Sequence, residues 1–157
     1  MRAAVPDGPR LAAPDELPAV ARLLHDFNTE FGDPAPPPDW LAERLATLIA
    51  GGETDVLVTG RPPLGLAILR YRPSLWSSGL ECYLAELYVV PPRRGQGLGR
   101  PLMEAVLDRA RARGADYMEL STEETDVAAR ALYESLGFTN RQGGLEGPLS
   151  YYYELEL

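Results

Sequence analysis

The stretch that decides the fold runs from Leu84 to Gly99 and reads LAELYVVPPRRGQGLG. It begins with an apolar run suited to a β-strand, and two prolines end that run. A short loop with two arginines and three glycines follows, and then the pattern of an amphipathic helix begins. This order predicts a helix N-terminus, with its N–H groups and the positive end of its dipole, at the end of a strand. The stretch therefore predicts a binding site for a phosphate-bearing ligand.

The length and composition of the chain bound the class of protein. A chain of 157 residues has the length of one domain with one core. Its hydrophobic share of 45% and charged share of 24% are those of an ordinary soluble globular protein. Apolar runs are too short to span a bilayer, and the first residues lack the apolar core of a secretory signal. We therefore expect a single cytoplasmic domain over residues 1–157, with residues 1–9 loose and no membrane partner.

The charge and the rare residue types exclude several functions. The net charge of −8 argues against a nucleic-acid partner, because duplex binding relies on clustered basic residues. It mildly favours a cationic substrate, although acidity also serves solubility alone. Cys82 and His25 are the single cysteine and the single histidine. An internal disulfide is thus impossible, a zinc site lacks its usual ligands, and no metal is expected.

Hydrophobic periodicity predicts alternating helices and strands along the chain. The expected helices span residues 15–31, 40–50, 100–113 and 126–136. The expected strands span residues 10–13, 55–59, 64–72, 80–90 and 115–121, with two more from residue 138 and over 150–157. A run of antiparallel strands precedes a strand–helix–strand unit. The order predicts an α/β (α+β) fold with a mixed, mostly antiparallel central sheet and helices on both faces.

Two common phosphate-binding loops fit the glycine-rich stretch poorly. A P-loop needs a lysine after its last glycine, and the chain contains no lysine. A dinucleotide-binding fold needs Gly-x-Gly-x-x-Gly after its first strand. Here Gly95, Gly97 and Gly99 alternate, and the loop lies late in the chain.

The loop fits a third pattern, Arg-x-x-Gly-x-Gly, over Arg94 to Gly99. It resembles the acetyl-CoA pyrophosphate loop of the GNAT superfamily of CoA-dependent N-acyltransferases. Upstream, residues 87–91 resemble the end of that family's fourth strand. Downstream, residues 126–138 resemble its Asn-x-x-Ala-x-x-Leu-Tyr-x-x-x-Gly-Phe motif, with Asp126 where asparagine is usual. The order of elements also matches, so the resemblance covers nearly the whole chain.

The resemblance implies a site for acetyl-CoA, the expected cosubstrate. The fourth and fifth strands of the family splay apart, and pantetheine bonds to backbone groups that correspond to Leu87 and Val89. Glycines let the backbone approach the pyrophosphate and turn N–H groups inward. Arg93 and Arg100 are either solvated surface charges or contacts of the 3′-phosphate. The cofactor-binding residues implied are Leu87, Val89, Arg94, Gly95, Gln96, Gly97, Gly99, Arg100, Asp126 and Ala129.

The resemblance also implies roles in acyl transfer. Tyr133 is the expected general acid, since a phenol with a pKa of about 10 keeps its proton at neutral pH. The backbone N–H of Val89 is the simplest donor to the oxyanion. Glu86 is a candidate general base, and a solvated strand residue is an equally good interpretation, because a β-bulge would change the direction in which it faces. The alternative bases are Asp126, Glu123 and Glu124.

The substrate side is less defined. The first two expected helices and the last strands bring aromatic residues beside acids, which suits a cationic amine. The leading hypothesis is an N-acetyltransferase that acts on a primary amine of a small molecule or peptide, and the resemblance also implies a homodimer. A non-catalytic CoA-binding sensor and the use of another acyl-CoA are the alternatives. The aromatic and acidic candidates are Phe27, Glu30, Phe31, Asp33, Asp39, Trp40, Tyr83, Tyr151, Tyr152 and Tyr153.

Overall fold

The computed structural model describes residues 7–157, which divide into two compact units. The first unit ends at Leu120 and the second begins at Ser121. Residues 1–6 of the segment expected to be loose lie outside the described residues. In the same segment, Asp7 accepts hydrogen bonds from the Gly60 N–H (2.8 Å) and from Arg61 Nε (3.2 Å). Its described part is therefore tied to the turn at Gly60.

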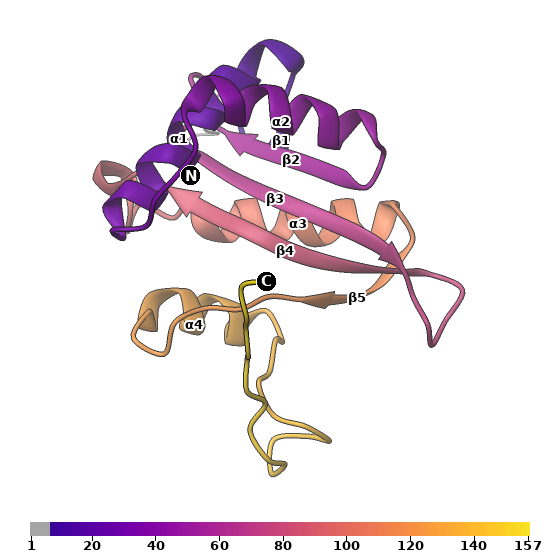
Figure 1. Ribbon diagram of the computed structural model, residues 1–157. Helices are drawn as coiled ribbons and strands as arrows, with labels where there is room; N and C mark the ends of the chain where they lie inside the picture. Colours follow the sequence, from indigo (N-terminus) through magenta and orange to yellow (C-terminus); the bar gives the residue numbers. More distant parts are fainter. Residues whose placement is uncertain (1–6) are drawn as a thin grey trace. The chain divides into compact units, whose positions relative to one another are not determined.

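The first unit is built on a five-stranded sheet in the order β1-β2-β3-β4-β5 (Figure 1). Neighbouring strands are antiparallel except β4 and β5, which are parallel. The mixed, mostly antiparallel sheet is thus confirmed. The strands are β1 (Arg10–Leu11), β2 (Thr54–Thr59), β3 (Gly65–Pro73), β4 (Leu80–Val89) and β5 (Ala115–Glu119).

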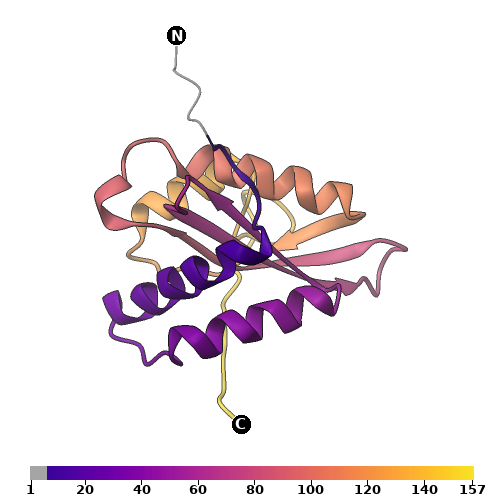
Figure 2. The ribbon, with the colours of Figure 1, turned by 90° about the horizontal axis from the view of Figure 1, so that it is seen from above.

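Three helices cover the two faces of this sheet. They are α1 (Leu17–Glu30), which follows a 3-10 turn at Pro14–Glu16, α2 (Pro38–Ala50) and α3 (Gly99–Ala112). Figure 2 shows α1 and α2 on one side of the sheet and α3 on the other. Helices on both faces are therefore confirmed, and the periodicity placed all three within a few residues of their observed ends. No helix within residues 7–157 is long and apolar enough to cross a membrane.

Each face of the sheet has its own buried core. On one face, residues of α1, α2 and the strands form a single apolar cluster: Leu17, Val20, Leu24, Leu45, Val56, Val58, Leu66, Ile68 and Tyr88. On the other face, α3 packs against β2 and β3 and buries Leu102, Met103 and Val106 completely. The alternation of side chains along each strand supplies both cores at once.

A bulge in β4 decides which way its side chains point. Ile68 pairs with Glu86, whereas the next residue, Leu69, pairs with Leu84, so Ala85 is an extra residue on β4. Directly paired residues share a face of the sheet. Glu86 therefore lies on the same face as Ile68, the face covered by α1 and α2. Leu84 lies with Leu69 on the face covered by α3.

The second unit contains α4 (Val127–Ser135) and a bridge between Arg141 and Leu149. The helix confirms the prediction for residues 126–136. The strands expected from residue 138 and over 150–157 were wrong, because the structure assigns no strand to either segment. A strand needs a hydrogen-bonded neighbour, and the one pairing that the structure gives this part of residues 7–157 is the bridge between Arg141 and Leu149.

Candidate functional site

The edge of β4 opens where β5 ends. β5 pairs with β4 only from Leu80 to Tyr83, because β5 ends at Glu119, the partner of Tyr83. The Val90 N–H donates to the Leu64 carbonyl, just before β3 (2.9 Å). In an antiparallel pair the N–H and C=O groups of every second residue face the partner strand, so those of Tyr88 face β3 as well. The backbone N–H and C=O groups of Leu87 and Val89 face the opposite side, away from β3. Within residues 7–157, no strand pairs with β4 on that side at Leu87 or Val89.

The glycine loop joins this edge to α3. After β4 the chain makes a 3-10 turn at Pro91–Arg93 and then passes through Gly95 (φ 74°) and Gly97 (φ 78°). No atom lies within 4 Å of the position a Cβ would take at either glycine, so backbone conformation, not crowding, requires glycine there. Gln96 accepts from Arg93 Nε (2.8 Å) and donates to the Pro92 carbonyl (3.1 Å).

The N-terminus of α3 follows the loop directly at Gly99. The first N–H groups of a helix have no preceding turn to accept them, and they point along the axis together with the positive end of the dipole. The loop and the helix end thus lie together at the end of β4, an arrangement typical of anion-binding sites. Both lie in the first unit, beside the open edge.

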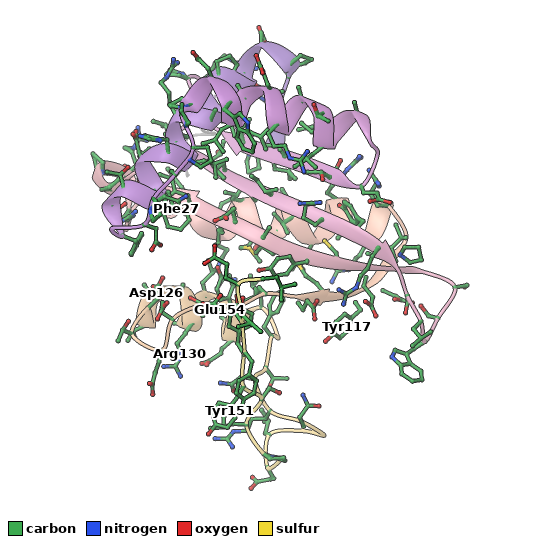
Figure 3. All side chains as sticks on the ribbon, in the orientation of Figure 1. Phe27, Tyr117, Asp126, Arg130, Tyr151 and Glu154 are labelled. Atoms are coloured by element: carbon green, nitrogen blue, oxygen red, sulfur yellow. The ribbon has the colours of Figure 1, made fainter. Side chains whose placement is uncertain are left out.

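The side chain of Arg94 is held by the end of α1. Its Nη1 and Nη2 donate to the Glu30 carboxylate (2.6 and 2.9 Å), and its Nε donates to the Val89 carbonyl (2.9 Å). The hydrogen bond from Arg94 holds the pKa of Glu30 below its usual value. Glu30 also accepts from the Tyr88 hydroxyl (3.1 Å), and Phe27, labelled in Figure 3, stacks on the Tyr88 ring. The guanidinium thus joins α1 to the end of β4.

Glu86 faces a pocket between the sheet and the two helices α1 and α2. The pocket has a volume of about 200 Å³. Its apolar lining comes from Leu24, Leu41, Leu45, Leu48, Ile68 and Ala85, and its polar lining from Asn28, Arg44, Arg70 and Glu86. Glu86 is partly buried, and burial raises the pKa of its carboxyl group. A carboxylate in such a place accepts a proton more readily than one in water.

Three polar residues of this pocket, Asn28, Arg44 and Arg70, were missed at the level of sequence. A signal for two of them was present. Arg44 lies three residues after Leu41 and therefore on the apolar stripe of α2. Arg70 continues the alternation of Leu66 and Ile68 along β3. A charged residue in an apolar position of an amphipathic element is the signal that predicts such a site.

The residues expected on the substrate side do not line the pocket. Phe31 and Trp40 are 60% and 52% exposed, and Phe27 and Glu30 are engaged with Tyr88 and Arg94. In the second unit, the side chains of residues 151–153 are exposed. Among residues 7–157, no group of three or more His, Cys, Asp or Glu side chains is arranged to hold a metal ion.

The second unit contains the expected general acid. Tyr133 on α4 is buried, and burial raises its pKa to about 12, with a smaller contribution from the negative charge of Asp126. Its ring contacts Phe138 edge to face, with 5.9 Å between the ring centres. Asp126 caps α4, because its Oδ1 accepts from the Ala129 N–H (3.1 Å). An asparagine there would make the same cap, so the departure from the motif preserves this function.

The other carboxylates considered as bases, Glu123 and Glu124, are exposed in the same unit. Arg130 donates to the backbone carbonyl of Glu124 (2.9 Å), and Figure 3 labels Asp126 and Arg130 on α4. Glu86, by contrast, is partly buried on β4 in the first unit.

The chain is similar to proteins of a known family and to solved structures. Residues 17–138 match the model of the acetyltransferase (GNAT) family. A solved structure from Arthrobacter sp. FB24, which carries an acetyltransferase name, is 46% identical with a TM-score of 0.84 and covers 99% of this chain and 100% of that one. A solved aminoglycoside acetyltransferase from a soil metagenome, in complex with sisomicin, shares the fold at 19% identity and a TM-score of 0.71, with 94% of this chain and 95% of that one covered.

Shorter matches were found with curated proteins. A mycothiol acetyltransferase of Beutenbergia cavernae is 45% identical over 69 residues, which are 42% of this chain and 23% of that protein. The ribosomal protein bS18-alanine N-acetyltransferase of Escherichia coli (strain K12) is 43% identical over 58 residues, which are 37% of this chain and 39% of that protein. Each match thus spans less than half of the curated relative.

Proposed function

We propose the reaction from one premise: this chain belongs to the GNAT family of acetyltransferases. The proposed reaction is transfer of the acetyl group of acetyl-CoA to a primary amine. One observation supports it most. The open edge at Leu87 and Val89, the loop through Gly95 and Gly97 and the N-terminus of α3 follow one another within one unit.

The proposed cofactor site uses these parts in order. The pyrophosphate lies against the glycine loop and the N-terminal amides of α3, and pantetheine lies along the backbone of Leu87 and Val89. Gln96, Gly99, Arg100, Asp126 and Ala129 complete the proposed contacts. When the diphosphate binds the guanidinium group of Arg94, it replaces the Glu30 carboxylate as the hydrogen-bond acceptor. This exchange costs little, because the side chains of the pair are 42% and 30% exposed.

Glu86, Val89 and Tyr133 are proposed to carry out the chemistry. Acetyl-CoA supplies an acetyl group activated as a thioester. Glu86 accepts one proton of the substrate ammonium, and the freed amine nitrogen then forms a bond to the acetyl carbon as the carbon–sulfur bond breaks. The Val89 N–H donates to the oxygen on which negative charge develops. Tyr133 gives its proton to the departing sulfur and regains one from the new amide nitrogen.

The test is release of free CoA from acetyl-CoA in the presence of a panel of amines. We expect release that depends on at least one amine and that falls when Glu86 is replaced by Gln. Binding of acetyl-CoA without release for any amine would contradict the proposal and support the CoA-binding sensor instead. Competition by propionyl-CoA and succinyl-CoA distinguishes the acetyl group from other acyl groups.

The two units are proposed to act as one catalytic domain over residues 1–157. The family match supports this, since it runs across the boundary between Leu120 and Ser121. A chain that ends at Leu120 should then lack activity in the same assay, and full activity would contradict the proposal.

The enzyme is further proposed to work in the cytoplasm as a homodimer of the 17.2 kDa chain. Light scattering that gives the mass of one chain would contradict the dimer.

A further inference from the structure

Two arginines with no partner line the pocket that Glu86 faces. They are Arg44 on α2 and Arg70 on β3. Neither has an ion pair or hydrogen bond within residues 7–157. Most arginines of this part of the chain do have one, as expected where 23 acidic residues face 15 arginines. Both side chains are exposed, so their guanidinium groups are open to an anionic group of a ligand in the pocket.

These guanidinium groups also stand apart from Glu86. No nitrogen of Arg44 or Arg70 lies within 4.0 Å of a Glu86 oxygen, and the pKa of Glu86 is raised by burial with no opposing cation. The pocket therefore has a negative group on β4 and positive groups on α2 and β3. The rest of the lining is apolar except for Asn28 on α1, which adds an amide.

We propose that the acceptor is an amino acid with an apolar side chain. This inference rests on the proposed function. The amine of the acceptor lies at Glu86, and its carboxylate binds Arg44 and Arg70, whose planar guanidinium groups match a carboxylate with paired hydrogen bonds. Its side chain packs on the leucines. The net charge of −8 favours a cationic substrate, but the two arginines give this pocket the opposite preference.

The first experiment compares leucine with leucinamide and 3-methylbutylamine as acceptors. The three share an apolar body and a primary amine, and leucine alone carries a carboxylate. We expect leucine to show a kcat/KM at least about tenfold higher than the other two. Leucinamide has the less basic amine and so offers more free base at neutral pH. Equal or faster reaction of leucinamide would overturn the inference.

The second experiment uses the variants Arg44→Gln and Arg70→Gln. Each should raise KM for leucine about tenfold and leave kcat and the reaction of leucinamide unchanged. Arg22→Gln, on the exposed side of α1, is the matched control and should change nothing. Equal losses with leucine and leucinamide would indicate a structural role and overturn the inference. Circular dichroism checks that each variant is folded.

A binding measurement separates this inference from the proposed function. Leucine is titrated into the chain saturated with CoA, where no acetyl transfer takes place. Saturable binding that Arg70→Gln weakens about tenfold supports the inference, even if no amine is acetylated. No binding of leucine overturns it, even if another amine is acetylated. A leucyl peptide that binds better than leucine would also overturn it, in favour of a protein N-terminus.

Discussion

The two faces of the sheet differ in whether their buried carboxylate has hydrogen-bond partners. On the face covered by α3, Asp55 accepts hydrogen bonds from the Tyr71 hydroxyl (3.0 Å), Arg109 Nε (2.7 Å) and Arg113 Nη1 (3.4 Å). Arg113 also lies over the Tyr71 ring at 4.5 Å. On the face covered by α1 and α2, Glu86 has no such partner within residues 7–157.

The difference separates stability from binding. A buried carboxylate that is fully hydrogen-bonded ties β2, β3 and α3 together, and its removal leaves buried groups unsatisfied. A partly buried carboxylate without partners costs stability and is available to a ligand. We therefore expect changes at Asp55 to act on folding and changes at Glu86 to act on turnover.

The largest expected effect is that of Glu86→Gln on turnover. Loss of a general base should lower kcat by about 100-fold or more. Glu43→Gln, on the exposed side of α2, is the control with the same chemical change and should leave kcat unchanged. Initial rates with the best amine of the panel measure both. A kcat of Glu86→Gln equal to that of the wild type would remove Glu86 from the mechanism.

The same variant makes a prediction for stability with a defined sign. The folded-state pKa of Glu86 is raised by burial, so the stability that its protonated form contributes is lost as the pH rises through that pKa. Glu86→Gln should therefore be at least as stable as the wild type at neutral pH, and the difference should shrink in acid. Thermal unfolding across roughly pH 4 to 8 measures this. A variant that is less stable at neutral pH would contradict the prediction.

The largest expected effect on folding is that of Asp55→Ala. It leaves the Tyr71 hydroxyl unsatisfied and Arg109 unpaired, which should lower the free energy of unfolding by about 3 kcal/mol. Tyr71→Phe removes a single hydroxyl from the same cluster and should cost about 1 kcal/mol. Urea denaturation gives both values, and kcat per folded molecule should stay constant. A loss at Asp55 no larger than that at Tyr71 would show that the arginines do not depend on it.

A smaller effect is expected from Tyr133→Phe. Loss of the proton donor should lower kcat about tenfold and leave the affinity for acetyl-CoA unchanged. With a pKa of about 12, Tyr133 keeps its proton throughout the neutral and mildly alkaline range. The wild type should therefore show no loss of kcat from this group as the pH rises through that range. Unchanged kcat in Tyr133→Phe would leave the sulfur to be protonated by water.

The smallest effect is expected from Gly97→Ala. An alanine at φ 78° costs about 1 kcal/mol, and this strain should weaken acetyl-CoA binding about fivefold. Gly143→Ala is the matched control, because it has φ 71° and equally open surroundings in the second unit. Calorimetry should show weaker binding for the first variant and wild-type binding for the second. Equal losses in both would mean that the strain acts through overall stability.

Much of the first unit was predictable from the sequence. The apolar periods of α1, α2 and α3 and the glycine loop after β4 follow from local patterns, and the structure has them where expected. The direction of Glu86 was not predictable, since it depends on the extra residue Ala85, and a bulge leaves no local signal. The strands expected after residue 137 failed for a related reason: a strand depends on a partner, which a period of two does not supply.

Acetyl-CoA binding by the purified wild-type chain tests the proposed site most directly. Calorimetric titration with acetyl-CoA should show one saturable site with a dissociation constant of roughly micromolar size, and ATP should give no comparable binding. ATP carries phosphates but no pantetheine for the open edge at Leu87 and Val89. No binding of acetyl-CoA to a folded chain, or equal binding of ATP, would contradict the assignment of the loop and the edge to acetyl-CoA.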